Sequence, residues 1–334
     1  MSLGKKNRAK ISGVAHWVPE KILSNKELEK MVDTTDEWIT SRTGIKERHI
    51  LEAGKASSDM AAEACKLLFE KTGTDPDDID VIVFGTVTPD MLFPASACLL
   101  QAKLGMSKAW GFDVSAACCG FAYSLVIGAQ FIESGSAKKV LVVGSDKMSS
   151  IVDYTDRNTC ILFGDAAGVV LLEKSEDEKL GILDYYNTVD GNGAQYLNMP
   201  GGGSLNPPTH ETVDKKMHTI YQDGKNVYQY AVKGMSEASA LIVERNGLTG
   251  KDVGLFVPHQ ANKRIIDSAA QRMGLKDDQV IINIEKYGNT TAATIPMALS
   301  EAVTAGRIKK GDYVVIAAFG GGFTCSSILV KWAY

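Results

Sequence analysis

Two adjacent cysteines stand where a thiol could act as a nucleophile. Cys118 and Cys119 lie in "DVSAACCGF", between an apolar stretch that predicts a strand and the apolar run "GFAYSLVIGAQFI", which predicts a buried helix. The start of a helix carries partial positive charge, which lowers the pKa of a nearby thiol from about 8.5. Cys119 would point about 100° round the helix, toward the core. We predict Cys118 as the nucleophile; two structural cysteines are the alternative, because free cysteine is commonly buried.

Three other segments carry groups that suit the same chemistry. His259 follows a predicted strand in "FVPHQANKRIID", Asn289 lies in the turn of "KYGNTTAATIP", and the glycine run "FGGGF" (319–323) offers backbone N–H groups for an oxyanion hole. Each has a structural alternative: a packed histidine, an ordinary turn asparagine and a flexible turn. Together they suit thioester exchange followed by stabilisation of an enolate.

Short β-branched runs alternate with amphipathic segments and so favour an α/β fold. We expect strands at 81–87, 138–146, 168–172, 254–258 and 313–319. Helical spacing of apolar residues appears in "SDMAAEACKLLFEKTG" and in "NVYQYAVKGMSEASALIVERNG", each ending in glycine. Strand and helix in alternation are typical of sheets covered by helices.

A weak internal repeat indicates two halves with one topology. Ile79 aligns with Val253 at 174 residues, Gly135 with Gly306 at 171, and Cys118 falls near Asn289, again at 171. The repeat predicts halves at residues 1–178 and 179–334. If matching loops meet between the halves, the cysteine faces the histidine, the asparagine and the glycine run in one composite site.

Composition excludes several classes of protein. A net charge of -4 gives no electrostatic case for binding nucleic acid. No apolar run approaches the roughly 18 residues of a membrane span, and the basic start lacks the apolar segment of a secretory signal, so we expect a cytoplasmic protein without membrane insertion. The six cysteines show no CxxC pair, so we expect neither disulfides nor a bound metal.

The ordered set "MVDTTDEWITSRTGIKERHI", "DVSAACCGF", "VPHQANKRII", "YGNTTAATIP" and "AFGGGFT" resembles β-ketoacyl-acyl carrier protein synthase III of the thiolase superfamily, from about residue 10 to the end. The resemblance implies duplicated α-β-α-β-α layers, each half with a mixed five-stranded sheet. It implies that Cys118 accepts an acyl group from acyl-CoA, and that malonyl-acyl carrier protein then loses CO2 and condenses with it, priming type II fatty acid synthesis without any cofactor. His259 and Asn289 match the other catalytic positions, and the amides of Cys118 and Gly321 match the oxyanion hole.

The resemblance also assigns residues to the substrates and to a second subunit. It implies that CoA is bound by Trp38, Arg42, Thr43, Arg157, Gly224 and Asn262. It implies that the acyl pocket is closed by Phe319 and by Phe93 of a homodimer partner, and that carrier protein docks on Lys263, Arg264 and Arg272, with Arg264 the best match. A solvated helix face is the alternative for these three cations.

Two departures from the family pattern bear on the acyl pocket. Cys119 replaces the more familiar alanine, and Cys325 stands where tryptophan is expected, so the identity of the acyl primer stays open. Three alternatives remain: a related synthase or acyltransferase of secondary metabolism, a papain-like hydrolase, and a non-catalytic CoA- or lipid-binding protein. The hydrolase lacks its CGSCW-like context. Degradative thiolases use a second cysteine, and elongating synthases carry a histidine at the position of Asn289.

Overall fold

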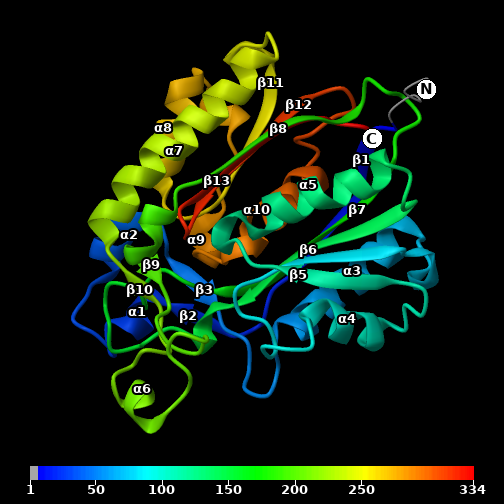
Figure 1. Cartoon of the computed structure of the whole chain (residues 1–334). Coiled ribbons are helices and arrows are strands. Elements are labelled where there is room, and N and C mark those ends of the chain that lie inside the picture. Colours follow the sequence, from blue (N-terminus) through cyan, green and yellow to red (C-terminus); the bar gives the residue numbers. More distant parts are fainter. Residues whose placement is uncertain (1–6) are drawn as a thin grey trace.

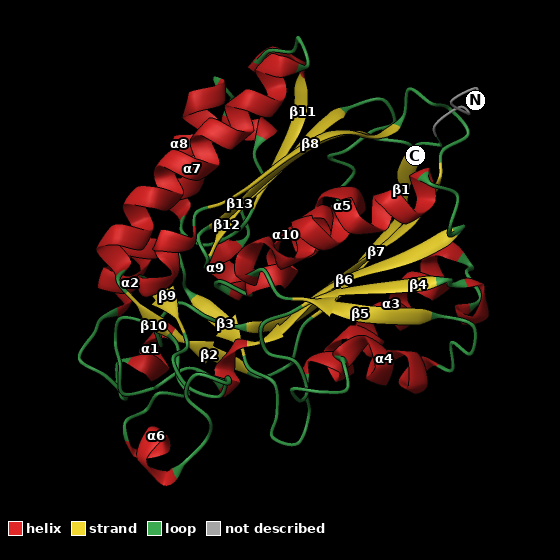
Figure 2. Cartoon of the chain, viewed as in Figure 1, coloured by secondary structure: helices red, strands yellow, loops and turns green. Residues whose placement is uncertain are grey.

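The computed structural model describes residues 7–334, which form five alternating layers of helices and strands (Figure 1; Figure 2). The two larger β-sheets enclose the central helices, and other helices cover the outer face of each of these sheets. The predicted α/β fold with α-β-α-β-α layers is therefore confirmed.

The first sheet contains five strands in the order β1-β7-β6-β4-β5. β4 pairs in parallel with β5 and β6, whereas β7 pairs antiparallel with β6 and β1, so the sheet is mixed as predicted. Its strands are β1 (Ala9–Trp17), β4 (Val81–Gly85), β5 (Trp110–Val114), β6 (Lys139–Lys147) and β7 (Asp165–Lys174).

The second sheet contains four strands in the order β11-β12-β13-β8. They are β8 (Gly181–Val189), β11 (Val253–Pro258), β12 (Tyr313–Gly320) and β13 (Thr324–Lys331). Where a fifth strand was expected, Val280 makes only an isolated parallel bridge to Phe256. The prediction of five strands in this half is wrong because the chain turns into a short helix at 284, too soon for a ladder.

The central layer is buried on both sides, as its apolar sequence requires. Its helices are α5 (Gly120–Glu133) and α10 (Thr294–Thr304), and one hydrophobic core joins them to Val140 of the first sheet and Val314 of the second. The outer helices α3 (Ser57–Thr72) and α4 (Ser96–Leu104) cover the first sheet, and α7 (Gly224–Arg245) and α8 (Lys263–Met273) cover the second. The layers therefore fix the ends of α5 and α10 relative to both sheets.

Short elements gather at one end of the layers, beside the starts of the central helices (Figure 1). They are β2 (Ile22–Ser24), α1 (Asn25–Leu28), α2 (Asp36–Thr43), β3 (Glu47–His49), β9 (Leu197–Asn198), α6 (His210–Asp214), β10 (Tyr221–Gln222) and α9 (Ile284–Tyr287). A hydrophobic cluster that includes Ile39, Met148, Phe163 and Ile284 holds much of this cap together.

Equivalent residues in the central elements of the two halves are 174 positions apart in the sequence. Val81 pairs with Val140 in the first sheet as Leu255 pairs with Val314 in the second. Single-turn helices precede the central helices at 117–119 and at 291–293, again 174 apart. The predicted match of Cys118 with Asn289 is therefore wrong by three positions, because α10 is shorter than α5 and this shifts the downstream glycines.

The predicted boundary between the halves, at residue 178, falls in the connection between β7 and β8. The first six residues of the predicted N-terminal half lie outside the described residues. The division into 1–178 and 179–334 stays a prediction, since one core joins both halves. Within residues 7–334, none of the helices is both long and apolar enough to cross a bilayer.

Candidate active site

One cavity of about 880 Å³ opens at the end of the molecule where the two halves meet. It lies beside the starts of α5, α7 and α8, where strand ends and helix N-termini leave polar groups facing a common space. It is lined by most of the residues predicted for a site: Trp38, Arg42, Thr43, Cys118, Gly224, His259, Asn262, Arg264, Asn289, Phe319 and Gly321. Arg157, Phe93, Lys263 and Arg272 do not line it.

Cys118 sits in a sharp turn between β5 and α5. Ala117 adopts a positive φ of 46°, and the single turn Ala117–Cys119 then leads directly into the helix. This conformation is costly for a residue with a side chain and is typical of functional turns. We call Ala117–Cys119 the first elbow. It presents the Cys118 thiol to the cavity at the positive end of α5.

The resting thiol of Cys118 is protonated, contrary to the expectation of a lowered pKa. Burial raises its pKa to about 12, and the negative charge of Asp146 adds to that effect. A hydrogen bond from the Asn289 side chain acts in the opposite direction without outweighing burial. A thiolate therefore forms only when a proton acceptor and a substrate are in place.

Cys119 points away from the cavity, as predicted. Its side chain is fully buried in the core between the two sheets, next to residues of α5. Burial raises the pKa of its thiol well above the ordinary value. Such a neutral, enclosed thiol packs as a small apolar group.

His259 directly follows β11, and its backbone N–H donates to the Ala317 carbonyl of β12 at 2.7 Å. Its Nδ1 lies 2.7 Å from Oγ1 of Thr294, whereas its Nε2 is buried and has no hydrogen-bond partner within residues 7–334. Burial lowers the pKa of the imidazole to about 3, so the ring is neutral. A neutral ring whose free nitrogen faces a cavity is suited to proton transfer or to hydrogen bonding with a ligand.

The Thr294 hydroxyl decides which nitrogen of His259 carries the proton. Oγ1 of Thr294 lies 3.2 Å from the Thr291 carbonyl, to which it donates. In that arrangement the hydroxyl accepts from Nδ1–H, and Nε2 presents a lone pair to the cavity. If the hydroxyl turns toward Nδ1 instead, Nε2 carries the proton and becomes a donor.

The backbone of Asn289, in the second half, is hydrogen-bonded to residues of the first half. Its N–H donates to the Leu162 carbonyl at 2.8 Å, and its own carbonyl accepts from the Gly164 N–H at 3.1 Å. Its side-chain Oδ1 accepts from the Thr291 N–H at 2.9 Å. Because that oxygen is engaged, the amide NH₂ is the group left for the cavity.

The glycine run lies against the first elbow. A Cβ placed on Gly320 would lie 2.8 Å from the amide nitrogen of Cys118, so only glycine leaves that amide open. Two backbone hydrogen bonds between Asp190 and Phe323, at 2.6 and 2.8 Å, anchor the end of the run. Gly321 lines the cavity beside Cys118, consistent with the predicted pair of oxyanion donors.

Trp38 of α2 stands at the mouth of the cavity with two arginines against its ring. The guanidinium carbons of Arg42 and Arg157 lie 5.6 and 5.4 Å from the ring centroid. Arg157 also bonds to the Asp33 carbonyl at 2.9 Å, which places it behind the tryptophan rather than in the cavity wall. Thr43 lines the cavity, but its hydroxyl is already bonded to the Ile39 carbonyl and the Ile45 N–H.

Two predicted CoA residues mark the starts of the outer helices. Gly224 is the first residue of α7, and Asn262 caps α8 by accepting from the Arg264 N–H at 2.9 Å. The Asn262 side-chain NH₂ donates to the carbonyl of Arg42 at 3.0 Å, which joins the mouth of the cavity to α8. Both helix ends carry partial positive charge that favours an anionic ligand.

The three predicted docking cations are not equivalent. Arg264 lines the cavity mouth, lies 5.0 Å over the ring of Tyr228 and forms no ion pair among residues 7–334. Lys263 pairs with Asp267 at 2.7 Å, and Arg272 pairs with Glu244 at 3.2 Å. Of these three cations, only Arg264 forms no ion pair within residues 7–334 and also lines the cavity.

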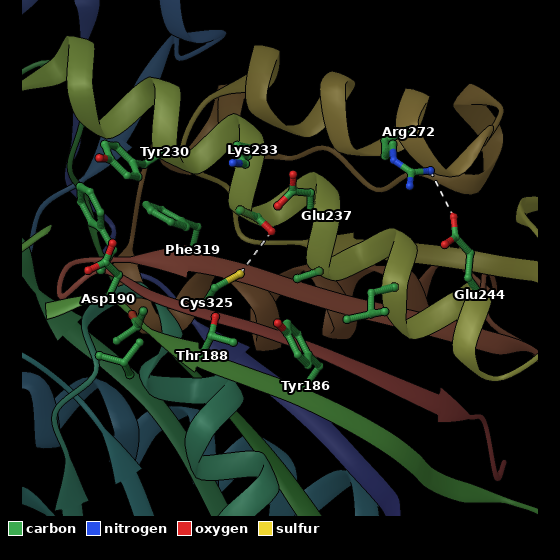
Figure 3. Close-up of a pocket in the computed structure, with 16 residues that line it drawn as sticks. Tyr186, Thr188, Asp190, Tyr230, Lys233, Glu237, Glu244, Arg272, Phe319 and Cys325 are labelled. Carbon is green, nitrogen blue, oxygen red and sulfur yellow. Dashed lines mark hydrogen bonds and ion pairs between the residues drawn. The ribbon is translucent and has the colours of Figure 1, made fainter. Parts of the chain in front are cut away.

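Arg272 lines a second cavity, of about 560 Å³, between α7 and the outer face of the second sheet (Figure 3). Cys325 lies on the floor of this cavity and donates to the Gly234 carbonyl at 3.4 Å, so the position where tryptophan was expected does not face the cysteine site. Phe319 lines both cavities and separates them.

Phe93 lies on an exposed loop, with 84% of its surface accessible. Leu92 beside it is exposed to 82%. Neither lines the cavity of its own chain. Its predicted role in the acyl pocket therefore requires a second copy of the chain.

Several residues that line the cavity were not predicted from the sequence. Apolar side chains form its inner wall, among them Val87, Met148, Phe163, Leu197 and Ile220, which come from five separate segments. No periodicity links them, because each belongs to a different loop or strand end. Thr294 begins α10, five residues after Asn289, and this short distance in the sequence could have identified it as a residue near the site. In residues 7–334 no three His, Cys, Asp or Glu side chains cluster as metal ligands.

Comparison with known proteins gives one consistent result. The family description "3-Oxoacyl-[acyl-carrier-protein (ACP)] synthase III" matches residues 112–191, and its C-terminal counterpart matches 243–332. The β-ketoacyl-[acyl-carrier-protein] synthase III of Koribacter versatilis is 57% identical over 328 residues, 98% of each chain, and that of Chlorobaculum tepidum is 52% identical, covering 97% of this chain and 99% of its own.

Comparison with solved structures gives the same result. The 3-oxoacyl-[acyl-carrier-protein] synthase III of Aquifex aeolicus is 41% identical, covers 97% of this chain and 100% of its own, and superposes with a TM-score of 0.90. A priming β-ketosynthase of a polyketide biosynthetic pathway is 33% identical, covers 100% of this chain and 98% of its own, and superposes with a TM-score of 0.91.

Proposed function

Because this chain belongs to the 3-oxoacyl-(acyl carrier protein) synthase III family, we propose that it condenses an acyl group from acyl-CoA with malonyl-acyl carrier protein, releasing CO2. It is an acyltransferase, and the reaction initiates fatty acid synthesis. The observation that carries the residue roles is that Cys118, His259 and Asn289 line one cavity, in which Nε2 of His259 has no hydrogen-bond partner among residues 7–334.

In the first half-reaction, Cys118 takes the acyl group from CoA. Its thiol proton passes to Nε2 of His259 while the sulfur attacks the thioester carbonyl. The amides of Cys118 and Gly321 hold the oxyanion, at the positive end of α5. When the bond from carbon to the CoA sulfur breaks, the CoA thiolate recovers the proton, leaving acyl-Cys118, free CoA and neutral His259.

In the second half-reaction, the malonyl thioester loses CO2 and its electron pair forms an enolate. The enolate oxygen accepts hydrogen bonds from the Asn289 NH₂ and from Nε2–H of His259, so Thr294 now donates to Nδ1. The enolate carbon attacks the acyl carbonyl, and the bond to Cys118 breaks. The cysteine thiolate takes one proton from solvent, which balances the cycle.

The CoA nucleotide would bind at the mouth of the cavity. Trp38 and Arg42 offer flat faces for a base, and the N-termini of α7 and α8 offer positive charge for phosphates. Arg157 would add its charge by leaving its contact with Asp33. Thr43, Gly224 and Asn262 line the way inward. Phe319 forms one wall of the acyl pocket.

We also propose that the protein binds carrier protein near α8, forms a homodimer and acts in the cytoplasm. Acidic carrier protein would meet Arg264 first, with Lys263 beside it at the start of α8 and Arg272 near the end of that helix. A homodimer explains why Phe93 is exposed and why Trp110, on the edge strand β5, is exposed to 55%. Covering such apolar groups with a second copy is a common use of an open sheet edge.

A synthase of secondary metabolism is the competing function, supported by the structural likeness to the polyketide priming enzyme. It differs in the acceptor rather than in the cysteine chemistry. Turnover with malonyl-acyl carrier protein separates the two. A non-catalytic CoA-binding protein would leave Cys118 unmodified.

The test is intact-mass spectrometry after incubation with a panel of short acyl-CoAs, followed by malonyl-acyl carrier protein. Wild-type protein should gain the mass of one acyl group and lose it again as the β-ketoacyl product forms. Cys118→Ser should not gain it, whereas Cys98→Ser, which removes an exposed thiol, should behave as wild type. Equal labelling of Cys118→Ser would refute the assigned nucleophile, and no labelling of wild type would refute the function.

A further inference from the structure

A buried carboxylate outside the reaction scheme binds a turn that mirrors the first elbow. Asp146, near the end of β6, is fully buried. Its Oδ1 accepts from the Thr86 hydroxyl, the Val87 N–H and both the N–H and hydroxyl of Thr88, at 2.8–3.1 Å. Its Oδ2 accepts from the Ala292 N–H at 3.1 Å. Five donors around one carboxylate form an anion hole.

Ala292 belongs to the counterpart of the first elbow. Thr291 has a positive φ of 52°, as Ala117 has 46°, and the single turn Thr291–Ala293 leads directly into α10. We call it the second elbow. At the 174-residue spacing, Ala292 is the counterpart of Cys118, so the amide that Asp146 binds corresponds to the amide predicted to hold the substrate oxyanion.

The same spacing pairs Asp146 with Gly320. Both lie at the ends of equivalent strands, β6 and β12. In the second half the position has no side chain, and a Cβ there would lie 2.8 Å from the Cys118 nitrogen. In the first half it carries the carboxylate that occupies the Ala292 amide. One elbow is thus open for a substrate, and the other is filled by the protein itself.

We propose that Asp146 is a positioning residue for Asn289: it fills the anion hole of the second elbow and thereby fixes that elbow for the decarboxylating step. The chain of contacts is short. Asp146 holds Ala292, the adjacent Thr291 N–H holds Oδ1 of Asn289, and the NH₂ of Asn289 is then aimed at the cavity. The proposal rests on the proposed function.

The charge of Asp146 is also unfavourable for the nucleophile, which a neutral structural residue would not be. Its charge lies close enough to Cys118 to disfavour the thiolate, and burial raises the pKa of Asp146 itself to about 6. The five donors favour the charged form and offset that burial. A neutral residue would spare the nucleophile this repulsion, whereas the charge provides a strong acceptor for the 86–88 loop and for the Ala292 N–H of the second elbow.

The discriminating variant is Asp146→Asn, which keeps the shape and removes the charge. Because four donors face Oδ1, the asparagine oxygen should take that side and its NH₂ should face the Ala292 N–H, donor against donor. The Ala292 N–H of the second elbow then loses its acceptor, whereas residues 86–88 keep their hydrogen bonds to residue 146. Decarboxylation and condensation should fall about 10- to 100-fold, and acyl transfer to Cys118 should stay within about threefold.

The control is Asp80→Asn. Asp80 precedes β4 and accepts from the N–H groups of Lys138 and Lys139, at 2.7 and 3.0 Å, at the opposite end of β6. It should leave both half-reactions unchanged. A second variant, Asp146→Ala, opens the anion hole, and added formate should restore condensation at least fivefold where neutral formamide does not.

Equal loss of both half-reactions in Asp146→Asn, or no loss of condensation, would overturn the inference. So would Asp146→Ala that formamide restores as well as formate does. If wild-type protein fails to acylate at all, the proposed function fails instead, and that outcome is seen before any variant is compared.

Discussion

The proposed tautomer change at His259 predicts that Thr294→Val slows both half-reactions, because the Thr294 hydroxyl is the partner of Nδ1 in each. Valine has nearly the shape of threonine but no hydroxyl, so Nδ1 of His259 loses its 2.7 Å partner inside a buried site. Acyl transfer uses the tautomer in which Nδ1–H donates to this hydroxyl, and Val leaves that N–H without an acceptor. Decarboxylation uses the tautomer in which the hydroxyl donates to Nδ1, and Val leaves that nitrogen without a donor.

The magnitude follows from the burial of the histidine. Leaving one buried polar group without its partner costs about 1–3 kcal/mol, which corresponds to a rate factor of roughly 5 to 150. We expect a loss in that range both for decarboxylation of malonyl-acyl carrier protein and for acylation of Cys118. Burial also holds the pKa of His259 at about 3, so the ring stays neutral and the loss should be constant from pH 6 to pH 8.

The assay measures CO2 release from malonyl-acyl carrier protein and, separately, the burst of free CoA from acyl-CoA. Thr290→Val is the matched control, because Thr290 is buried in the same loop and its hydroxyl contacts only the sulfur of Met297 at 3.6 Å. An unchanged rate in either assay for Thr294→Val, or equal defects in Thr290→Val, would refute the assigned role of the hydroxyl.

Three further predictions concern the oxyanion hole, stability and docking. Gly320→Ala places a Cβ 2.8 Å from the Cys118 nitrogen and should slow the CoA burst about 100-fold; a burst at the wild-type rate would contradict an oxyanion hole there. His259 has a folded pKa below its unfolded value, so its contribution to stability is complete above about pH 6.5 and is lost as pH falls toward 3. At pH 5.5 the loss is about 1.4 kcal/mol, and urea melts of His259→Gln should lack it; an unchanged pH dependence would show that the imidazole is not held neutral. Arg264→Glu should raise KM for malonyl-acyl carrier protein about tenfold and Arg272→Glu should not; equal effects would move the docking site along α8.

The sequence predicted elements well where local patterns are strong. The expected strand at 138–146 is observed at Lys139–Lys147, and the expected helix ending before Gly247 is observed at Gly224–Arg245. Runs of β-branched residues and helical spacing with a terminal glycine depend only on neighbours in the chain. The edge strand β8 was missed, because only its first residues are buried and its sequence shows no continuous apolar run.

Chain position alone could not align the two halves at the elbows. Cys118 was matched with Asn289, whereas the structure matches it with Ala292, because the helices that follow differ in length. The positive φ of Ala117 and Thr291, which identifies the elbows as equivalent, leaves no mark in residue type. Neither residue is glycine, the one type that would have signalled that conformation.

By itself the sequence determined the α/β class and the residue types of the candidate site, since periodicity and short motifs are properties of neighbouring residues. The tertiary structure decided the states of those residues. Burial makes Cys118 a neutral thiol and His259 a neutral imidazole, the reverse of what a helix N-terminus alone predicts for the thiol. Partners far apart in the chain, such as Thr294 with His259 and Asp146 with Ala292, then fix where protons and amides point. Desolvation and long-range hydrogen bonds exist only once the chain has folded, and for that reason no motif could supply them.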